Sequence, residues 1–285
     1  MFKGILIGDC YGAGFEFKNS MLKYNDGKKF YDHPTHMASD GSGDSLKAGM
    51  YTDDTQMSIA VAETLLGDDL SEDAFAENFV KCFKRDTRKG YASGFYHFLM
   101  EQKDGTSFIE NIRPNSEKNG AAMRSVPLGF LQNVSTVKVI AERQASLTHK
   151  TEHGINSSII VGLMSYFFIH DVAPKNELTD WLKSFYEQYP FEETWTKPVP
   201  CHGISTVLAV HTILMSTNSM NETLIKSVAL GGDTDSVASI ACGIQDLNKT
   251  KLDDFNKVLV DTCEQGAYGL DYCLELEKKL KFKYS

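Results

Sequence analysis

The sequence GINSSIIVGLMSYFFIH at residues 154–170 predicts a helix that is packed on most of its sides. A helix with apolar residues around its whole circumference is a buried helix, whereas a surface helix keeps one polar face. The large apolar residues here include Ile155, Ile159, Val161, Leu163, Met164, Phe167 and Phe168. We therefore expect this segment to lie at the centre of a helical protein.

Helical periodicity continues on both sides of this segment. The alternation at residues 134–137 sits beside good helix formers, so we interpret it as the opening of a helix rather than a strand. Residues 18–50 and 101–119 are rich in polar and turn-forming residues and are predicted to be loops. We predict an all-α fold and a single domain over residues 1–285. The other helices are expected within residues 54–66, 72–84, 203–215, 221–229 and 236–245, with two more in 251–280 separated near residues 266–269.

The composition fits a soluble globular protein and argues against two kinds of partner. The 285 residues carry a formal net charge of −9, and an acidic chain without a basic block binds a phosphate backbone poorly. No apolar run approaches the roughly 20 residues that span a bilayer. The six cysteines show neither CxxC spacing nor a Cys/His cluster. We expect a cytoplasmic monomer that binds neither a nucleic-acid duplex nor a membrane.

A first acidic cluster, Thr52-Asp53-Asp54-Thr55, stands directly before an amphipathic run. Thr52 is suited to cap a helix, and carboxylates in the first turn are stabilised by the helix dipole. Taken alone, the cluster favours this ordinary capping interpretation. The same oxygen atoms, held at a rigid helix start, could also ligate a hard divalent cation.

A second acidic cluster, Gly231-Gly232-Asp233-Thr234-Asp235-Ser236, changes this balance. Two glycines permit a tight turn before it, and an apolar helical run follows. Capping is again the simple interpretation. Two clusters of the same composition in one chain instead indicate a shared oxygen-rich site, of the kind in which two metal ions assist hydrolysis. Spacing alone leaves the two interpretations about evenly balanced.

The N-terminal segment adds two carboxylates to an otherwise apolar run. Glycines at positions 4, 8 and 12 lie on one face of a helix and indicate close packing against another helix. Asp9, in the same helix, needs a partner if it is buried, either backbone groups or an arginine. Glu16 follows near the end of the helix and is the better candidate for a site.

Four motifs in this order resemble those of the ADP-ribosylglycohydrolase family, and in particular its bacterial branch that includes the dinitrogenase-reductase-activating glycohydrolases. Thr148-His149 falls where the family carries a Thr-His pair, and RKGY at residues 88–91 is similar to a weaker family signature. The matches together span residues 4–243. The four motifs are GDCYGAGFEF at residues 8–17, YTDDT at 51–55, NGAAMRSVPLG at 119–129 and GGDTDS at 231–236.

The resemblance implies a compact orthogonal multi-helix bundle with a two-metal centre, holding Mg²⁺ or, as the alternative, Mn²⁺. The implied metal ligands are Thr52, Asp53, Asp54, Asp233, Asp235 and Ser236. The implied catalytic residues are Glu16, Asp54 and Asp235. The implied contacts to ADP-ribose are Ser116, Asn119, Gly120, Ala121, Met123 and His149. Arg124 is expected to have a structural role.

The resemblance also implies the reaction, which is removal of ADP-ribose from a modified protein side chain or from a small ADP-ribosyl substrate. An arginine linkage is favoured, and a serine linkage is the alternative. Two rival hypotheses are a non-catalytic ADP-ribose-binding protein on the same scaffold and a metal-dependent phosphoester or pyrophosphate hydrolase. His33 and His36 lie in a poorly matched segment and are expected to be solvated loop residues.

Overall fold

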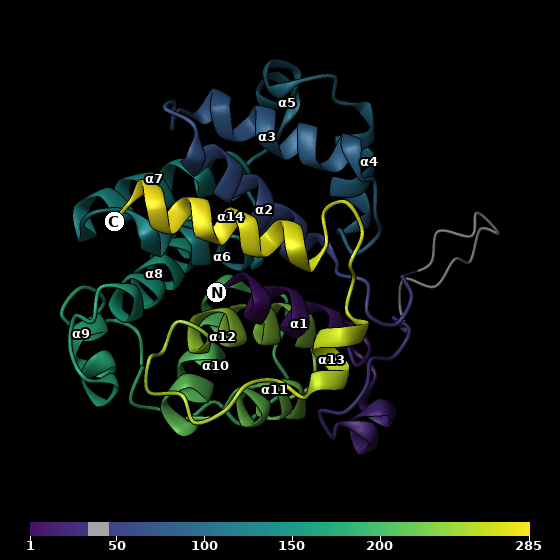
Figure 1. The fold of residues 1–285 in the computed structure, drawn as a ribbon. Helices are drawn as coiled ribbons and strands as arrows, with labels where there is room; N and C mark the ends of the chain where they lie inside the picture. Colours follow the sequence, from purple (N-terminus) through teal and green to yellow (C-terminus); the bar gives the residue numbers. More distant parts are fainter. Residues whose placement is uncertain (34–45) are drawn as a thin grey trace.

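Helices are the only regular secondary structure in the part of the chain that this computed structural model describes, residues 1–33 and 46–285. The all-α prediction is therefore confirmed (Figure 1). The α-helices are α1 (Phe2–Ala13), α2 (Asp53–Leu66), α3 (Glu72–Arg85), α4 (Ser93–Glu101), α5 (Gly105–Asn111), α6 (Gly120–Met123), α7 (Val134–Ser146), α8 (Glu152–Ile169), α9 (Leu178–Lys183), α10 (Gly203–Ser216), α11 (Met220–Ala229), α12 (Thr234–Gln245), α13 (Lys257–Thr262) and α14 (Leu270–Lys283). Three 3₁₀ helices accompany them: η1 (Asn19–Tyr24), η2 (Val126–Phe130) and η3 (Lys175–Glu177).

Helix α8 is the central helix that the sequence predicts. It packs against α6, α7, α9, α10, α12 and η2, so its apolar circumference is covered on most sides. Thr151 caps its start by accepting a hydrogen bond from the backbone N–H of Gly154 at 3.1 Å. The prediction of a buried central helix is confirmed.

Helices α1 and α12 lie side by side with their backbones in contact (Figure 1). A Cβ atom added at Gly4 would lie 2.2 Å from the carbonyl oxygen of Cys242, and one added at Gly8 would lie 2.3 Å from that of Ala238. At Gly12 the added atom would lie 2.5 Å from the Cα of Asp235. All three glycines are needed for this approach, as the sequence indicates.

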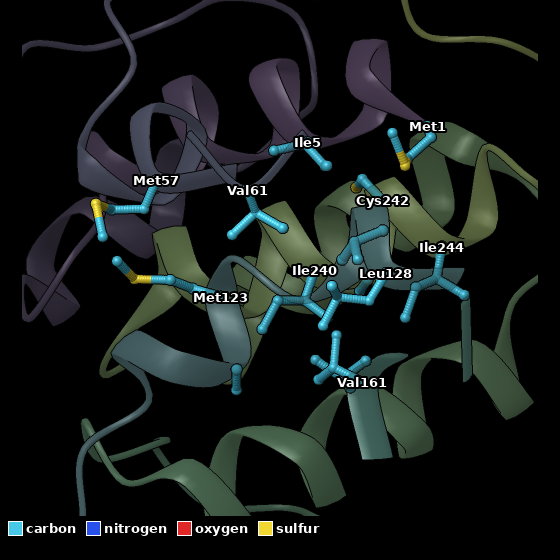
Figure 2. Close-up of a cluster of buried hydrophobic side chains, with 14 of the residues drawn as sticks. Met1, Ile5, Met57, Val61, Met123, Leu128, Val161, Ile240, Cys242 and Ile244 are labelled. Carbon is cyan, nitrogen blue, oxygen red and sulfur yellow. The ribbon is translucent and has the colours of Figure 1, made fainter. Parts of the chain in front are cut away.

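The hydrophobic core connects α1, α2 and α12 to the central helix α8 (Figure 2). Ile5 of α1, Val61 of α2 and Ile240 of α12 are almost fully buried and belong to one cluster with Leu128 and Val161. Burying side chains of this size stabilises the fold by about 1.5–3 kcal/mol each. The helix starts that carry the acidic clusters are therefore anchored in the core.

The segment 101–119, predicted to be a loop, contains helix α5. Asp104 and Ser107 form a capping box in which Asp104 Oδ1 accepts from the backbone N–H of Ser107 at 2.8 Å, and Phe108 is buried. Within the segment 18–50, η1 is a further short helix. The C-terminal region holds two helices as expected, although the first begins only at Lys257. Within the described residues, no helix is long and apolar enough to cross a membrane.

Candidate active site

The two acidic clusters, although far apart in the sequence, line one pocket with a volume of about 530 Å³. The pocket brings together helix starts from α2 and α12, the turn after α1 and the segment around α6. Of the residues implied by the resemblance, those that line it are Glu16, Asp53, Asp54, Ser116, Asn119, Gly120, Met123, His149, Asp233, Asp235 and Ser236. Thr52 and Ala121 are fully buried behind this lining.

Asp9 fixes the first acidic cluster from behind. Its carboxylate accepts hydrogen bonds from the hydroxyl of Thr52 at 2.8 Å and from the hydroxyl of Thr55 at 2.6 Å. It also accepts from the backbone N–H groups of the same two residues at 3.0 Å. Burial raises the pKa of Asp9, and these hydrogen bonds oppose that shift. Asp9 thus satisfies backbone groups, which is one of the two partners the sequence indicates.

The same helix α1 also holds the start of the second cluster. Thr234 donates from its hydroxyl to the carbonyl oxygen of Gly12 at 2.7 Å. Gly231 and Gly232 turn the chain just before it with φ values of +72° and +80°, a conformation that favours glycine. The turn is tied to Val199, whose backbone N–H donates to the carbonyl of Gly231 at 3.0 Å. One helix therefore sets the relative position of the two acidic helix starts.

Glu16 reaches the pocket through a strained turn at the end of α1. Phe17 has a φ of +49°, which is uncommon for a residue with a side chain. Its N–H donates to the carbonyl oxygen of Gly232 at 2.9 Å, so the turn is held directly against the second cluster. Strain of this kind is often found at functional sites.

The carboxylates in the pocket are crowded enough to disfavour their ionised forms. Burial, followed by the negative charge of neighbouring carboxylates, raises the pKa of Asp53, Asp54 and Asp235 well above the usual range. Asp54 Oδ1 is buried and accepts no hydrogen bond from any described residue. Like charges gathered in this way are stabilised by a bound cation.

His33 is not a solvated loop residue, so that expectation from the sequence is wrong. Its side chain is 1% exposed, and its Nε2 lies 3.0 Å from Glu16 Oε2. The segment before it packs on the end of α1, where the rings of Tyr31 and Phe15 meet edge to face at 5.4 Å. His36 lies outside the described residues.

His149 lines the pocket beside Thr148. Arg124 donates to the hydroxyl oxygen of Thr148 at 2.9 Å, and that hydroxyl lies 2.6 Å from Nδ1 of His149. Since arginine can only donate, the hydroxyl proton is free to point at Nδ1, and in that arrangement the ring proton lies on Nε2. Burial lowers the pKa of His149 to about 3, so the ring is neutral near pH 7.

Arg124 has the structural surroundings that the sequence favours for it. Its guanidinium donates to the carbonyl oxygen of Gln144 at 2.9 Å and lies over the ring of Phe79 at 4.5 Å. The side chain is only 1% exposed. Asn119 links the neighbouring segment to the second cluster, because its Nδ2 donates to Asp233 Oδ2 at 3.0 Å.

An aromatic and cationic part of the lining was missed by the sequence analysis. Phe95 and Phe98, on α4, stack with their ring centroids 5.8 Å apart, and Ile112 lines the pocket with them. Arg113 and Lys118 add positive charge. The only signal in the sequence for this region was RKGY at residues 88–91, which ends just before α4.

Comparisons with known proteins show the family to which the chain belongs. The profile of the ADP-ribosylglycohydrolase family matches residues 1–245, and the chain belongs to that family. Its fold is shared by a solved structure described as an ADP-ribosylglycohydrolase-related protein complex, with a TM-score of 0.72, 18% identity, and coverage of 100% of this chain and 96% of the other.

Two named relatives show which members the chain is similar to. The ADP-ribosylhydrolase ARH3 of Gallus gallus is 26% identical, and the match covers 85% of this chain and 82% of that protein. The ADP-ribosyl-[dinitrogen reductase] glycohydrolase of Rhodospirillum rubrum is also 26% identical, with coverage of 84% and 81%. Family and relatives together identify the chain as a glycohydrolase that acts on ADP-ribosyl compounds.

Proposed function

We propose that this protein hydrolyses the glycosidic bond between ADP-ribose and a protein side chain, with an arginine linkage as the expected substrate and a serine linkage as the alternative. The observation that supports this is the meeting of carboxylates from three segments in one pocket of about 530 Å³. A pocket of that volume suits a small-molecule ligand. Neighbouring aromatic faces on α4 offer a surface for a purine ring, and Arg113 and Lys118 offer charge for phosphates.

We propose two divalent cations as the cofactor, Mg²⁺ or alternatively Mn²⁺. The donor set from the two acidic clusters consists of oxygen atoms, which such cations prefer. The buried Asp54 Oδ1, with no hydrogen bond from a described residue, keeps its lone pairs available. Cations held by these residues would supply Lewis-acid chemistry, which polarises a water molecule beside the ribose. The ligands in this proposal are Thr52, Asp53, Asp54, Asp233, Asp235 and Ser236.

The side chains around the pocket have distinct roles in the proposed reaction. Glu16 or Asp54 accepts the proton of the attacking water, and Asp235 adds negative charge that stabilises the oxocarbenium-like state. His149 donates a hydrogen bond from Nε2 to an oxygen of the ligand. The remaining contacts to ADP-ribose come from Ser116, Asn119, Gly120 and Met123, which line the pocket. The resemblance also implies a contact from Ala121, but that residue is fully buried behind the lining and does not reach the ligand.

The test is incubation with two peptides, one carrying arginine-linked and the other serine-linked ADP-ribose, with MgCl₂, with MnCl₂ or with excess chelator. Mass spectrometry should detect free ADP-ribose and the unmodified peptide from one linkage only when a divalent cation is present. Asp54→Ala and Asp235→Ala should release no ADP-ribose while keeping their helical circular dichroism. Full activity in chelator would contradict the metal-dependent mechanism.

The same experiment separates the two rival functions. A pyrophosphate hydrolase would release AMP and leave a phosphoribosylated peptide. A binding protein would release nothing from either peptide, although free ADP-ribose would still raise its melting temperature. The carboxylates that converge on the pocket favour an enzyme over a binding protein, and the identity of the released product separates glycosidic from pyrophosphate cleavage.

A further inference from the structure

We propose that His33 supplies a nitrogen ligand to the metal centre, so that one cation position prefers a divalent ion of the first transition series, such as Mn²⁺, to Mg²⁺. This inference rests on the metal centre of the proposed function and extends it. The inference is based on the closeness of three side chains, Glu16, His33 and Asp235. These three side chains come from the end of α1, the segment before residue 34, and the start of α12.

The distances among the three side chains fit one cation. One donor atom from each of them lies within 4.8 Å of the other two, and His33 Nε2 is 3.0 Å from Glu16 Oε2. For metal–ligand bonds of about 2.1 Å, neighbouring ligands of an octahedral ion are roughly 3 Å apart and opposite ligands roughly 4.2 Å. The distance between His33 and Glu16 equals that of neighbouring ligands on one ion, and the 4.8 Å limit on the other distances is a few tenths of an ångström above that of opposite ligands.

The placement of His33 is set by packing that does not depend on a metal. Its backbone N–H donates to the carbonyl oxygen of Leu46 at 3.2 Å. Two residues earlier, Tyr31 sits so close to α1 that a Cβ atom added at Gly14 would lie 2.9 Å from the Cβ of Tyr31. The imidazole is thus delivered to Glu16 already ordered, which lowers the entropic cost of ligand binding.

An imidazole nitrogen among the ligands changes which cation the site prefers. Mg²⁺ and Ca²⁺ take oxygen ligands, whereas imidazole nitrogen suits transition-series ions. The ligands proposed above are all oxygen atoms, and on their own they would discriminate little between Mg²⁺ and Mn²⁺. Adding a single nitrogen at the Glu16 and Asp235 side shifts the preference of that position toward the transition-series ion.

Binding measurements on the protein without substrate test the inference. Isothermal titration with MnCl₂ and MgCl₂ should show that His33→Gln weakens Mn²⁺ binding by about tenfold or more, with a much smaller effect on Mg²⁺. His170→Gln is the matched control, because His170 lies at the end of α8 and contacts Gly129 and Tyr166. It should bind both ions like the unaltered protein. Equal weakening of both ions in His33→Gln would overturn the proposal.

Pulsed electron paramagnetic resonance of the Mn²⁺-loaded protein provides a second test, and its first measurement uses the unaltered protein alone. A coordinated imidazole should give a ¹⁴N coupling that changes to a ¹⁵N pattern when the histidines are labelled. The coupling should vanish in His33→Gln and persist in His170→Gln. Absence of any histidine nitrogen coupling would overturn the proposal. Either result is independent of ADP-ribose release, so failure of the proposed function would appear separately in the peptide assay.

Discussion

Arg88 holds Glu264 with both arms of its guanidinium, with Nη1 lying 2.9 Å from Oε2 and Nη2 lying 3.0 Å from Oε1. The two residues are 176 positions apart in the chain. Nη1 also donates to the carbonyl oxygen of Tyr51 at 2.8 Å, and the guanidinium lies 3.5 Å above the Tyr51 ring. Because Tyr51 directly precedes the first acidic cluster, the C-terminal part of the chain holds that cluster in place.

The first prediction concerns this clamp. Arg88→Lys keeps the positive charge but loses the two-armed contact. We expect divalent-cation affinity to fall by about tenfold and the free energy of unfolding to fall by about 1–3 kcal/mol. Titration calorimetry and urea denaturation measure the two effects. Arg85→Lys is the control, since Arg85 pairs with Glu63 and lies over the Tyr268 ring. Loss of stability without loss of affinity is expected there, and identical behaviour of both variants would contradict the prediction.

The second prediction concerns the crowded carboxylates. Burial and neighbouring charges raise the pKa of Asp235 in the folded protein. The free energy of unfolding therefore falls as the pH rises from about 4, where the unfolded chain ionises, through the raised pKa of the folded protein. Without a cation, Asp235→Asn should therefore melt about 2–4 °C higher than the unaltered protein at pH 7.5. With MnCl₂ the order should reverse, because only the unaltered protein binds the ion fully.

Thermal melts in chelator and in MnCl₂ check the effect of Asp235→Asn. Asp261→Asn, at an exposed ion pair with Lys257, should change neither melt, since exposed pairs contribute little. A lower melting temperature for Asp235→Asn in chelator would show that the carboxylates do not repel one another as described.

The third prediction concerns the contact between α1 and α12. In Gly8→Ala the new methyl group would lie 2.3 Å from the carbonyl oxygen of Ala238, so the two helices must move apart. We expect a loss of at least about 1–3 kcal/mol in the free energy of unfolding and weaker cation binding. In Gly266→Ala the methyl group meets nothing within 4 Å, and urea denaturation should detect almost no change. A harmless Gly8→Ala would refute the close backbone contact.

The fourth prediction concerns acid stability. Burial lowers the pKa of His211 to about 4, and its Nε2 lies 3.0 Å from the hydroxyl of Thr179. Since the unfolded chain takes up the proton near pH 6.5, this residue favours the folded state above that pH and loses its contribution as the pH falls toward about 4. Urea denaturation should show that the free energy of unfolding falls between pH 7 and pH 4.5 by about 2 kcal/mol less in His211→Gln than in the unaltered protein. Parallel curves would contradict the assignment.

The sequence predicted those parts of the molecule that depend on regular spacing. The buried periodicity of α8, the glycine face of α1 and the acidic helix starts all follow from local patterns. The first acidic cluster both caps a helix and lines the pocket. The hydroxyl of Thr52 accepts a hydrogen bond from the N–H of Asp54 at 3.3 Å as a helix cap, and Asp53 and Asp54 line the pocket.

The parts that escaped prediction depend on contacts between distant segments. His33 is buried because its segment packs on the end of α1, and no periodic pattern marks such a segment. Phe95 and Phe98 lie on a nine-residue helix whose aromatic residues could equally have been core. A single capping box in a polar stretch was too short a signal to reveal α5.

Both acidic helix starts, those of α2 and α12, are hydrogen-bonded to the single helix α1, and this has a consequence for how the protein loses activity. Asp9 and Gly12 of α1 hold α2 and α12 through hydrogen bonds, and α1 itself is almost entirely buried. Amide hydrogens in such a helix exchange with solvent only when the whole domain opens. Local fraying therefore leaves the site assembled, and the rate of heat inactivation should equal the rate of global unfolding.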